Sequence, residues 1–167
     1  LYLYPANDAQ ARHVYAASQR TVALELPDGR YTLYAVANLG TDTGPLPEAE
    51  VRALRSAWNP DGSDSGTLPM SAMRTFTVRG TTQIAIELVR AVAKVDFSYT
   101  VAADFRNSLS VRSVRLCNVP RFAALFGEGR ITADGECAAT EAFPADGDGY
   151  SAVYYLPENL QGKNVLI

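Results

Sequence analysis

The stretch QIAIELVRAVAKVDFSYTV at residues 83–101 decides the fold, because its apolar residues alternate in two different phases. Successive side chains of a β-strand point to opposite faces of the sheet. An apolar set can therefore change face only through an extra residue, a bulge, or a strand that passes between two sheets. The change falls between Leu88 and Arg90. The first set is Ile84, Ile86 and Leu88, and the second is Val89, Ala91, Ala93, Val95, Phe97, Tyr99 and Val101.

An amphipathic helix is the alternative for this stretch, because some of its apolar residues also fall at helical spacing, opposite charged side chains. The composition favours a strand, since β-branched and aromatic residues fit a pleated sheet better than a helix. We expect residues 84–88 and 89–101 to contact opposite faces, with a bulge or bend near Arg90. The residues at helical spacing are Ile84, Leu88, Ala91, Val92, Val95 and Tyr99, opposite Glu87, Arg90 and Lys94.

Turn signals divide the rest of the chain into short elements. Residues 22–26 alternate, residues 27–29 (PDG) form a turn, and residues 31–38 (YTLYAVAN) are predicted to return as the second strand of a hairpin. One short helix is predicted between Thr41 and Trp58, with Pro47 near its first turn. Further strands are predicted at 1–4, 74–78, 109–119 and 150–156, and loops with small strands over 121–149. This pattern predicts a mainly β protein, a β-sandwich of about seven strands with one short helical insertion.

Composition limits the classes of function. The 167 residues are 47% hydrophobic and 20% charged, which is typical of one globular domain. A net charge of -3 without a long basic run argues against nucleic acid as a partner. No run is long and apolar enough for a membrane helix, and no signal peptide is visible. Because the sequence starts at Leu1, we expect it to be a cropped or processed piece.

Few residues could support catalysis. His13 is the single histidine, so a Ser-His-Asp triad or a histidine metal cluster has little to build on. Residues 63–66 (SDSG) faintly resemble a serine protease segment, but a polar loop explains them better. The pairs Asp61 with Asp64 and Asp146 with Asp148 lack EF-hand spacing and are better explained as solvated turns. We therefore expect no enzyme activity, no cofactor and no metal.

The two cysteines leave two interpretations open. A bond between Cys117 and Cys137 would close a loop of about 20 residues and stabilise the fold by roughly 3 kcal/mol in the chain-entropy model. Two buried free thiols are the alternative, and the choice depends on the redox compartment.

Tyrosine is frequent, with nine residues, several of them on predicted strands. Ring burial with an exposed hydroxyl group is the simpler explanation. An aromatic platform for sugars is the other, and it could also use Trp58. The strand tyrosines are Tyr31, Tyr34, Tyr150, Tyr154 and Tyr155.

Five segments of the chain stand out together: LPDGRYTLYAVANLG at 26–40, LPMSA at 68–72, LVRAVAKVDF at 88–97, CNVP at 117–120 and YYLPENLQG at 154–162. In their order and spacing they resemble the fimbrillin-type pilus subunits, and the associated anchor or tip proteins, of Bacteroidales. The resemblance covers roughly residues 20–162 and implies a transthyretin-like β-sandwich. It also implies an exported lipoprotein at the outer membrane and cell surface, within a fimbrium.

This sequence departs from the family pattern at both ends. It has no lipid-attachment cysteine upstream and no second sandwich domain downstream. Residues 1–162 are therefore predicted to be an N-terminal fimbrillin-like domain. Residues 163–167 (KNVLI) are predicted to be a linker or the start of the missing domain, although a simple terminus fits equally well.

The family resemblance also implies a mechanism and partners. A subunit lacks or loses one strand, and an extended strand of a neighbouring subunit fills the groove by main-chain pairing. We expect Leu1–Tyr4 to be the displaced strand, released by proteolysis after Arg12 or Arg20; exposed arginines without a role are the alternative. The predicted function is thus a structural or adhesive fimbrial subunit that binds other subunits. A surface module that binds glycans or host ligands is the alternative function.

Overall fold

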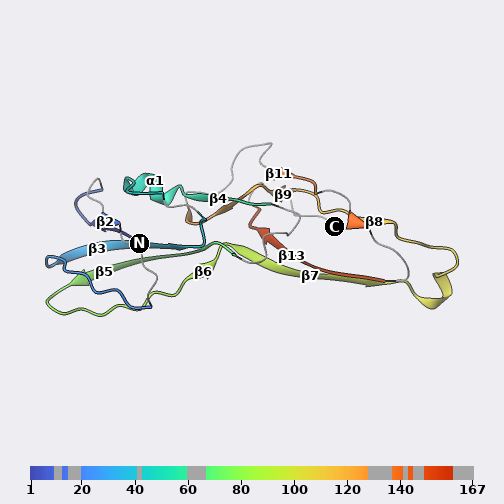
Figure 1. The fold of residues 1–167 in the computed structure, drawn as a ribbon, viewed down its shortest axis with the longest axis horizontal. Coiled ribbons are helices and arrows are strands. Elements are labelled where there is room, and N and C mark those ends of the chain that lie inside the picture. The colour runs from blue at the N-terminus through green and yellow to red at the C-terminus, as the bar shows by residue number, and fades with distance from the viewer. Residues whose placement is uncertain are drawn as a thin grey trace. The chain divides into compact units, whose positions relative to one another are not determined.

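The computed structural model describes residues 1–9, 13–14, 20–40, 43–59, 67–127, 137–140, 143–144 and 149–159. Within these residues the protein is mainly β, with several sheets (Figure 1). The strands are more numerous than the sequence predicted, because many are only two or three residues long. The chain divides into two compact units. Unit 1 comprises Leu1–Ser56, Pro69–Ala91 and Ala124–Arg130, and unit 2 comprises Ala57–Leu68, Val92–Ala123 and Ile131–Ile167.

Unit 1 is built on a five-stranded antiparallel sheet with the order β2-β1-β3-β5-β6. Its long central pair is β3 with β5, which run side by side in Figure 1 and are in register from Gly29 opposite Val78 to Ala37 opposite Met70. The strands are β1 (Tyr2–Pro5), β2 (His13–Val14), β3 (Gly29–Ala37), β5 (Met70–Val78) and β6 (Val89–Arg90).

The predicted hairpin between residues 22–26 and 31–38 is wrong, because the two segments do not pair with each other. The segment 31–38 does form β3, but it pairs with β1 and β5, and residues 21–27 belong to no strand. Leu24 and Leu26 instead pack, partly buried, against buried side chains of β1, β3 and β5. Alternation predicts which side chains are buried, whereas the ladder partner depends on contacts with distant segments that alternation does not report.

Each face of the unit 1 sheet carries its own apolar cluster. The Leu3 cluster consists of Leu3, Tyr31, Leu33, Ala35 and Val78. The tyrosine cluster, which holds side chains of the opposite parity from β1 and β3, consists of Tyr2, Tyr4, Tyr34 and Val51. Both faces of this sheet are thus buried along β1 and the middle of β3.

The predicted helix is present but spans only one and a half turns. It is α1 (Glu48–Arg52), with Pro47 at its N-cap and two glutamates in its first turn, near the positive end of the helix dipole. Val51 is fully buried and is the residue through which α1 contributes to the tyrosine cluster. Trp58 lies beyond the helix, after β4 (Arg55–Ala57).

The decisive stretch is extended and not helical. The alternation of residues 84–88 is as predicted, with Ile86 and Leu88 packed on the Leu3 cluster of unit 1. The strand breaks at Ala91, one residue from the predicted Arg90, and continues as β7 (Val92–Thr100) in unit 2. The prediction was wrong for Val89, which is 65% exposed, and for Ala93, which is exposed while its neighbour Val92 is buried. The second phase holds from Val95 onward, with Val95, Phe97 and Tyr99 half-buried.

Unit 2 is built on a two-stranded antiparallel ribbon of β7 and β13 (Gly149–Pro157), in register over all nine residues. The predicted strand 109–119 is instead split into β8 (Ser113–Val114) and β9 (Val119–Pro120). The Leu116 cluster, consisting of Leu116, Val119, Tyr154 and Leu156, packs one face of the ribbon. The shorter elements are η1 (Ala103–Phe105), β10 (Phe122–Ala124) paired with β4, β11 (Cys137–Ala138) with β9, and β12 (Phe143–Pro144) with β8.

Candidate functional site

Strand β1 lies in an apolar groove of unit 1 and is the first candidate site. Its Tyr2, Leu3 and Tyr4 side chains are 5%, 0% and 0% exposed. Leu3 enters the Leu3 cluster, and the two tyrosines enter the tyrosine cluster on the other face. A strand that buries successive residues on both faces is enclosed by the protein and does not merely lie on its surface.

Polar contacts fix the two tyrosines of β1. The Tyr4 hydroxyl donates to the Leu46 carbonyl at 2.7 Å, and the Tyr2 hydroxyl is hydrogen-bonded to the Thr43 hydroxyl. The Tyr4 ring meets the Tyr34 ring edge to face, with centroids 5.9 Å apart. The groove therefore specifies both the depth and the register of the strand that fills it.

Tyr34 forms the floor of this groove. Its hydroxyl donates to the Glu48 carboxylate at 2.8 Å, at the start of α1. Its ring also meets the ring of Phe126 edge to face, with centroids 5.1 Å apart. Tyr34 thus connects β3, α1 and the segment after β10 around the pocket for Tyr4.

The expectation that the Leu1–Tyr4 strand is weakly bound is not supported by this burial. Burying one large apolar side chain stabilises a protein by about 1.5–3 kcal/mol, so three of them contribute on the order of 5 kcal/mol. The sequence suggested weak binding because the strand is short. The energy depends on burial and not on length.

β1 has a paired neighbour on each side. It pairs with β3 along its whole length, from Tyr2 opposite Tyr34 to Pro5 opposite Tyr31. On its other side, β2 pairs with Tyr2 and Leu3. Main-chain ladders on both sides therefore hold β1 in the sheet.

The two arginines of the predicted cleavage site differ in what the structure describes. Arg20 is exposed and belongs to no strand, which makes its backbone suitable for a protease. Arg12 lies outside the described residues. Cleavage at either position stays a prediction.

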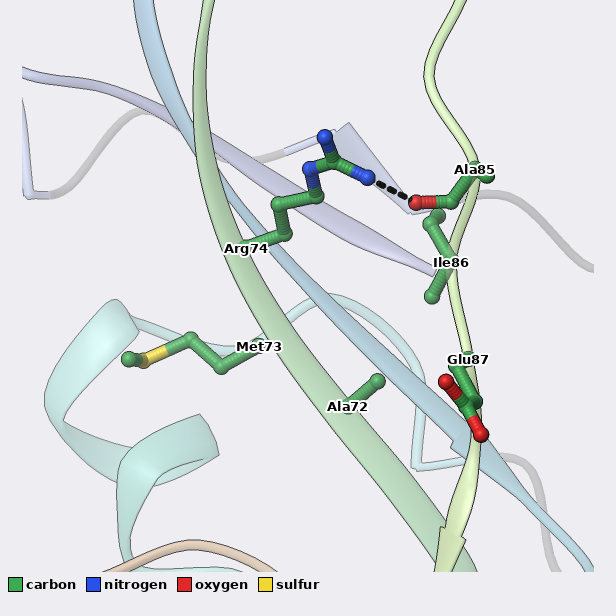
Figure 2. Close-up of a pocket in the computed structure, with 6 residues that line it drawn as sticks. All are labelled: Ala72, Met73, Arg74, Ala85, Ile86 and Glu87. Atoms are coloured by element: carbon green, nitrogen blue, oxygen red, sulfur yellow. Dashed lines mark hydrogen bonds between the residues drawn. The ribbon is translucent and has the colours of Figure 1, made fainter.

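The second candidate site in unit 1 is a recess between β5 and residues 85–87, the segment before β6. β5 and β6 pair at Met70 opposite Arg90 and at Ser71 opposite Val89, and then the ladder stops. Figure 2 shows the Arg74 side chain reaching across the resulting recess, of about 300 Å³, to the carbonyl of Ala85. The side chain of Met73 points away from the recess (Figure 2). The lining residues are Ala72, Met73, Arg74, Ala85, Ile86 and Glu87.

Aromatic rings gather on the ribbon of unit 2. The rings of Tyr99 and Tyr150 stack with centroids 6.0 Å apart and an interplanar angle of 18°, and Phe97 lies 6.3 Å from Tyr99. The hydroxyl groups of Tyr150 and Tyr154 are hydrogen-bonded at 2.8 Å. Burial, followed by this hydrogen bond, raises the pKa of Tyr154, so the phenol stays neutral well above pH 10. The Tyr99 hydroxyl is buried and has no hydrogen-bond partner within the described residues.

The prediction that Trp58 could be an exposed ligand-binding side chain is wrong. It is 6% exposed, and its indole Nε1 donates to the Tyr155 carbonyl at 2.8 Å. Tyr31, Tyr34 and Tyr154 are buried as well. Sequence could not distinguish these rings from Tyr150 because alternation gives a face but not what covers it.

Cys117 and Cys137 are both partly buried free thiols in the structure. Cys137 lies opposite Pro120 across the β9–β11 pair, three residues beyond Cys117 along the chain. The disulfide stays a prediction for the oxidised protein.

Most of the other predicted motifs lie outside the described residues. His13 is on β2. Residues 61–66 and 145–148 lie outside the described residues, as do residues 160–167 with the predicted domain boundary. In the part of the chain that is described, no three His, Cys, Asp or Glu side chains gather as metal ligands, and no helix has the length and hydrophobicity to span a membrane.

No protein-family model matches the chain, and no curated protein is significantly similar to it. The resemblance to fimbrillin-type subunits therefore depends on the sequence segments alone.

Proposed function

We propose that this protein is a structural or adhesive subunit of a cell-surface fimbria that assembles by strand exchange, and that the β1 groove is the exchange site. The burial of Tyr2, Leu3 and Tyr4 on both faces of the sheet, beside the long strand β3, carries the proposal. The mainly β architecture is consistent with the transthyretin-like sandwich of the family, which is part of the proposal.

Exchange at this groove requires a replacement strand. Loss of β1 alone would expose both clusters and leave the edge of β3 without its ladder, at a cost on the order of 5 kcal/mol. An incoming strand that pairs with β3 and fills the same pockets restores these contacts as β1 leaves. The donor therefore needs large apolar or aromatic residues at three successive positions.

The test combines cleavage with peptide exchange. The folded protein is treated with trypsin and then incubated with a fluorescent peptide that carries residues 1–5 (LYLYP). We expect cleavage at Arg12 or Arg20, replacement of β1 by the peptide, and end-to-end oligomers of the mature full-length protein in electron microscopy.

Two controls make this experiment specific. A peptide in which Leu3→Asp is introduced should not bind, because it would place a carboxylate in the Leu3 cluster. The double variant Arg12→Gln, Arg20→Gln should resist cleavage and retain β1. Intact arginines in the folded wild-type protein, or a cut protein that keeps β1 and stays monomeric, would contradict the proposal.

A second candidate function is a surface module that binds glycans. The stacked pair Tyr99 and Tyr150 beside Phe97 favours it, because both tyrosines are partly exposed and aromatic faces bind the apolar faces of sugars. A glycan array would support this function if binding disappeared in a Tyr150→Ala variant and persisted in Tyr155→Ala.

A further inference from the structure

The outer edge of β7 is open in the described part of unit 2. β7 and β13 form a two-stranded sheet, and β13 is the only described strand that pairs with β7. Two-stranded ribbons are marginally stable alone, and an unpaired strand edge is a template for another strand. A partner for this edge would extend the sheet.

The charges at the centre of β7 indicate which partner fits. Lys94 and Asp96 flank Val95 on the solvent face, with side chains 53% and 68% exposed and their charged groups 3.1 Å apart. Two β7 strands can pair antiparallel about a twofold axis at Val95. Each Lys94 then lies directly opposite Asp96 of the other copy. The dimer therefore contains two pairs of opposite charges between the copies.

The rest of the strand is compatible with the same register. Twofold pairing about Val95 sets Ala93 opposite Phe97 and Val92 opposite Ser98, so residues of equal parity share a face. No two like charges lie opposite each other between Val92 and Thr100. An antiparallel pair of this kind is isologous and closes as a dimer.

We propose that the β7 edge is an interface for a second copy of this chain, formed by antiparallel β7–β7 pairing centred on Val95. The ladder supplies main-chain hydrogen bonds, and the two cross-strand Lys94–Asp96 pairs set the register. The inference does not depend on the proposed fimbrial function, because it involves a different strand and a different unit.

Charge reversal tests this interface. In a homodimer of the Lys94→Glu variant, positions 94 and 96 are both acidic, so acidic side chains lie opposite each other at both cross-strand contacts. In a homodimer of the Asp96→Lys variant, basic side chains lie opposite each other at both contacts. We expect each variant alone to dimerise about tenfold more weakly than the wild type, as measured by analytical ultracentrifugation. An equimolar mixture of the two variants should form heterodimers at least as tightly as the wild type forms homodimers, because every cross-strand pair is then attractive.

The mixture also shows that both variants are folded, and circular dichroism of each provides a second check. Arg79→Glu changes the net charge as Lys94→Glu does, but in an exposed turn of unit 1, and should dimerise like the wild type. A wild-type chain that stays monomeric at every concentration would overturn the proposal. So would unchanged dimerisation of Lys94→Glu, or a mixture no stronger than its components.

Discussion

Two tyrosines of β3 make hydrogen bonds and ring contacts that hold the elements of unit 1 together. Tyr34 contacts Tyr4 and Phe126 with its ring and binds Glu48 with its hydroxyl. Tyr31 lies on the same strand but on the opposite face, and its hydroxyl donates to the Pro27 carbonyl at 3.0 Å. The two residues therefore offer a matched comparison between a charged and a neutral acceptor.

We expect Tyr34→Phe to lower the free energy of unfolding by about 2 kcal/mol, and Tyr31→Phe by about 1 kcal/mol, because hydrogen bonds to charged groups contribute more. Urea denaturation followed by tryptophan fluorescence measures both. Equal losses would mean that the Tyr34–Glu48 hydrogen bond does not secure α1 more strongly than an ordinary hydrogen bond.

At the scale of elements, the decisive stretch breaks at Ala91, between β6 and β7. Val89 on β6 is 65% exposed, and Val92 at the start of β7 is 6% exposed. The amide of Ala91, between them, donates to the Pro69 carbonyl at 2.8 Å. The break therefore has its own hydrogen bond and is a defined bend.

A pair of substitutions reports on this bend. We expect Val92→Asp to destabilise the protein by about 3 kcal/mol or more, because it buries a carboxylate, and Val89→Asp to change stability by less than about 0.5 kcal/mol. Thermal unfolding of both variants gives the comparison. If Val89→Asp were the more damaging one, the originally predicted phase, with Val89 inside, would be correct.

At the scale of the whole molecule, the two units are interleaved in sequence. The chain crosses between the two units five times, at 56–57, 68–69, 91–92, 123–124 and 130–131. Since neither unit is one continuous segment, neither can form from a single stretch of chain. We infer that the two units unfold together.

Variants in the two cores test this cooperativity. Leu3 and Leu116 are both fully buried, one in each unit. Leu3→Ala and Leu116→Ala should each lower stability by about 2–5 kcal/mol and shift one common transition, seen by calorimetry and by fluorescence alike. Two separate transitions, each moved by only one variant, would show that the units unfold independently.

The sequence by itself determined the mainly β class, the extended conformation of residues 83–101, the strand at 31–38 and the short helix after Pro47, because these follow from local periodicity and turn residues. Only the tertiary structure decided that β3 pairs with β1 and β5, that Tyr2 to Tyr4 are buried on both faces, and that Trp58 is covered. These outcomes depend on which distant segments pack together, and packing across a sheet leaves no signal in the spacing of a single strand.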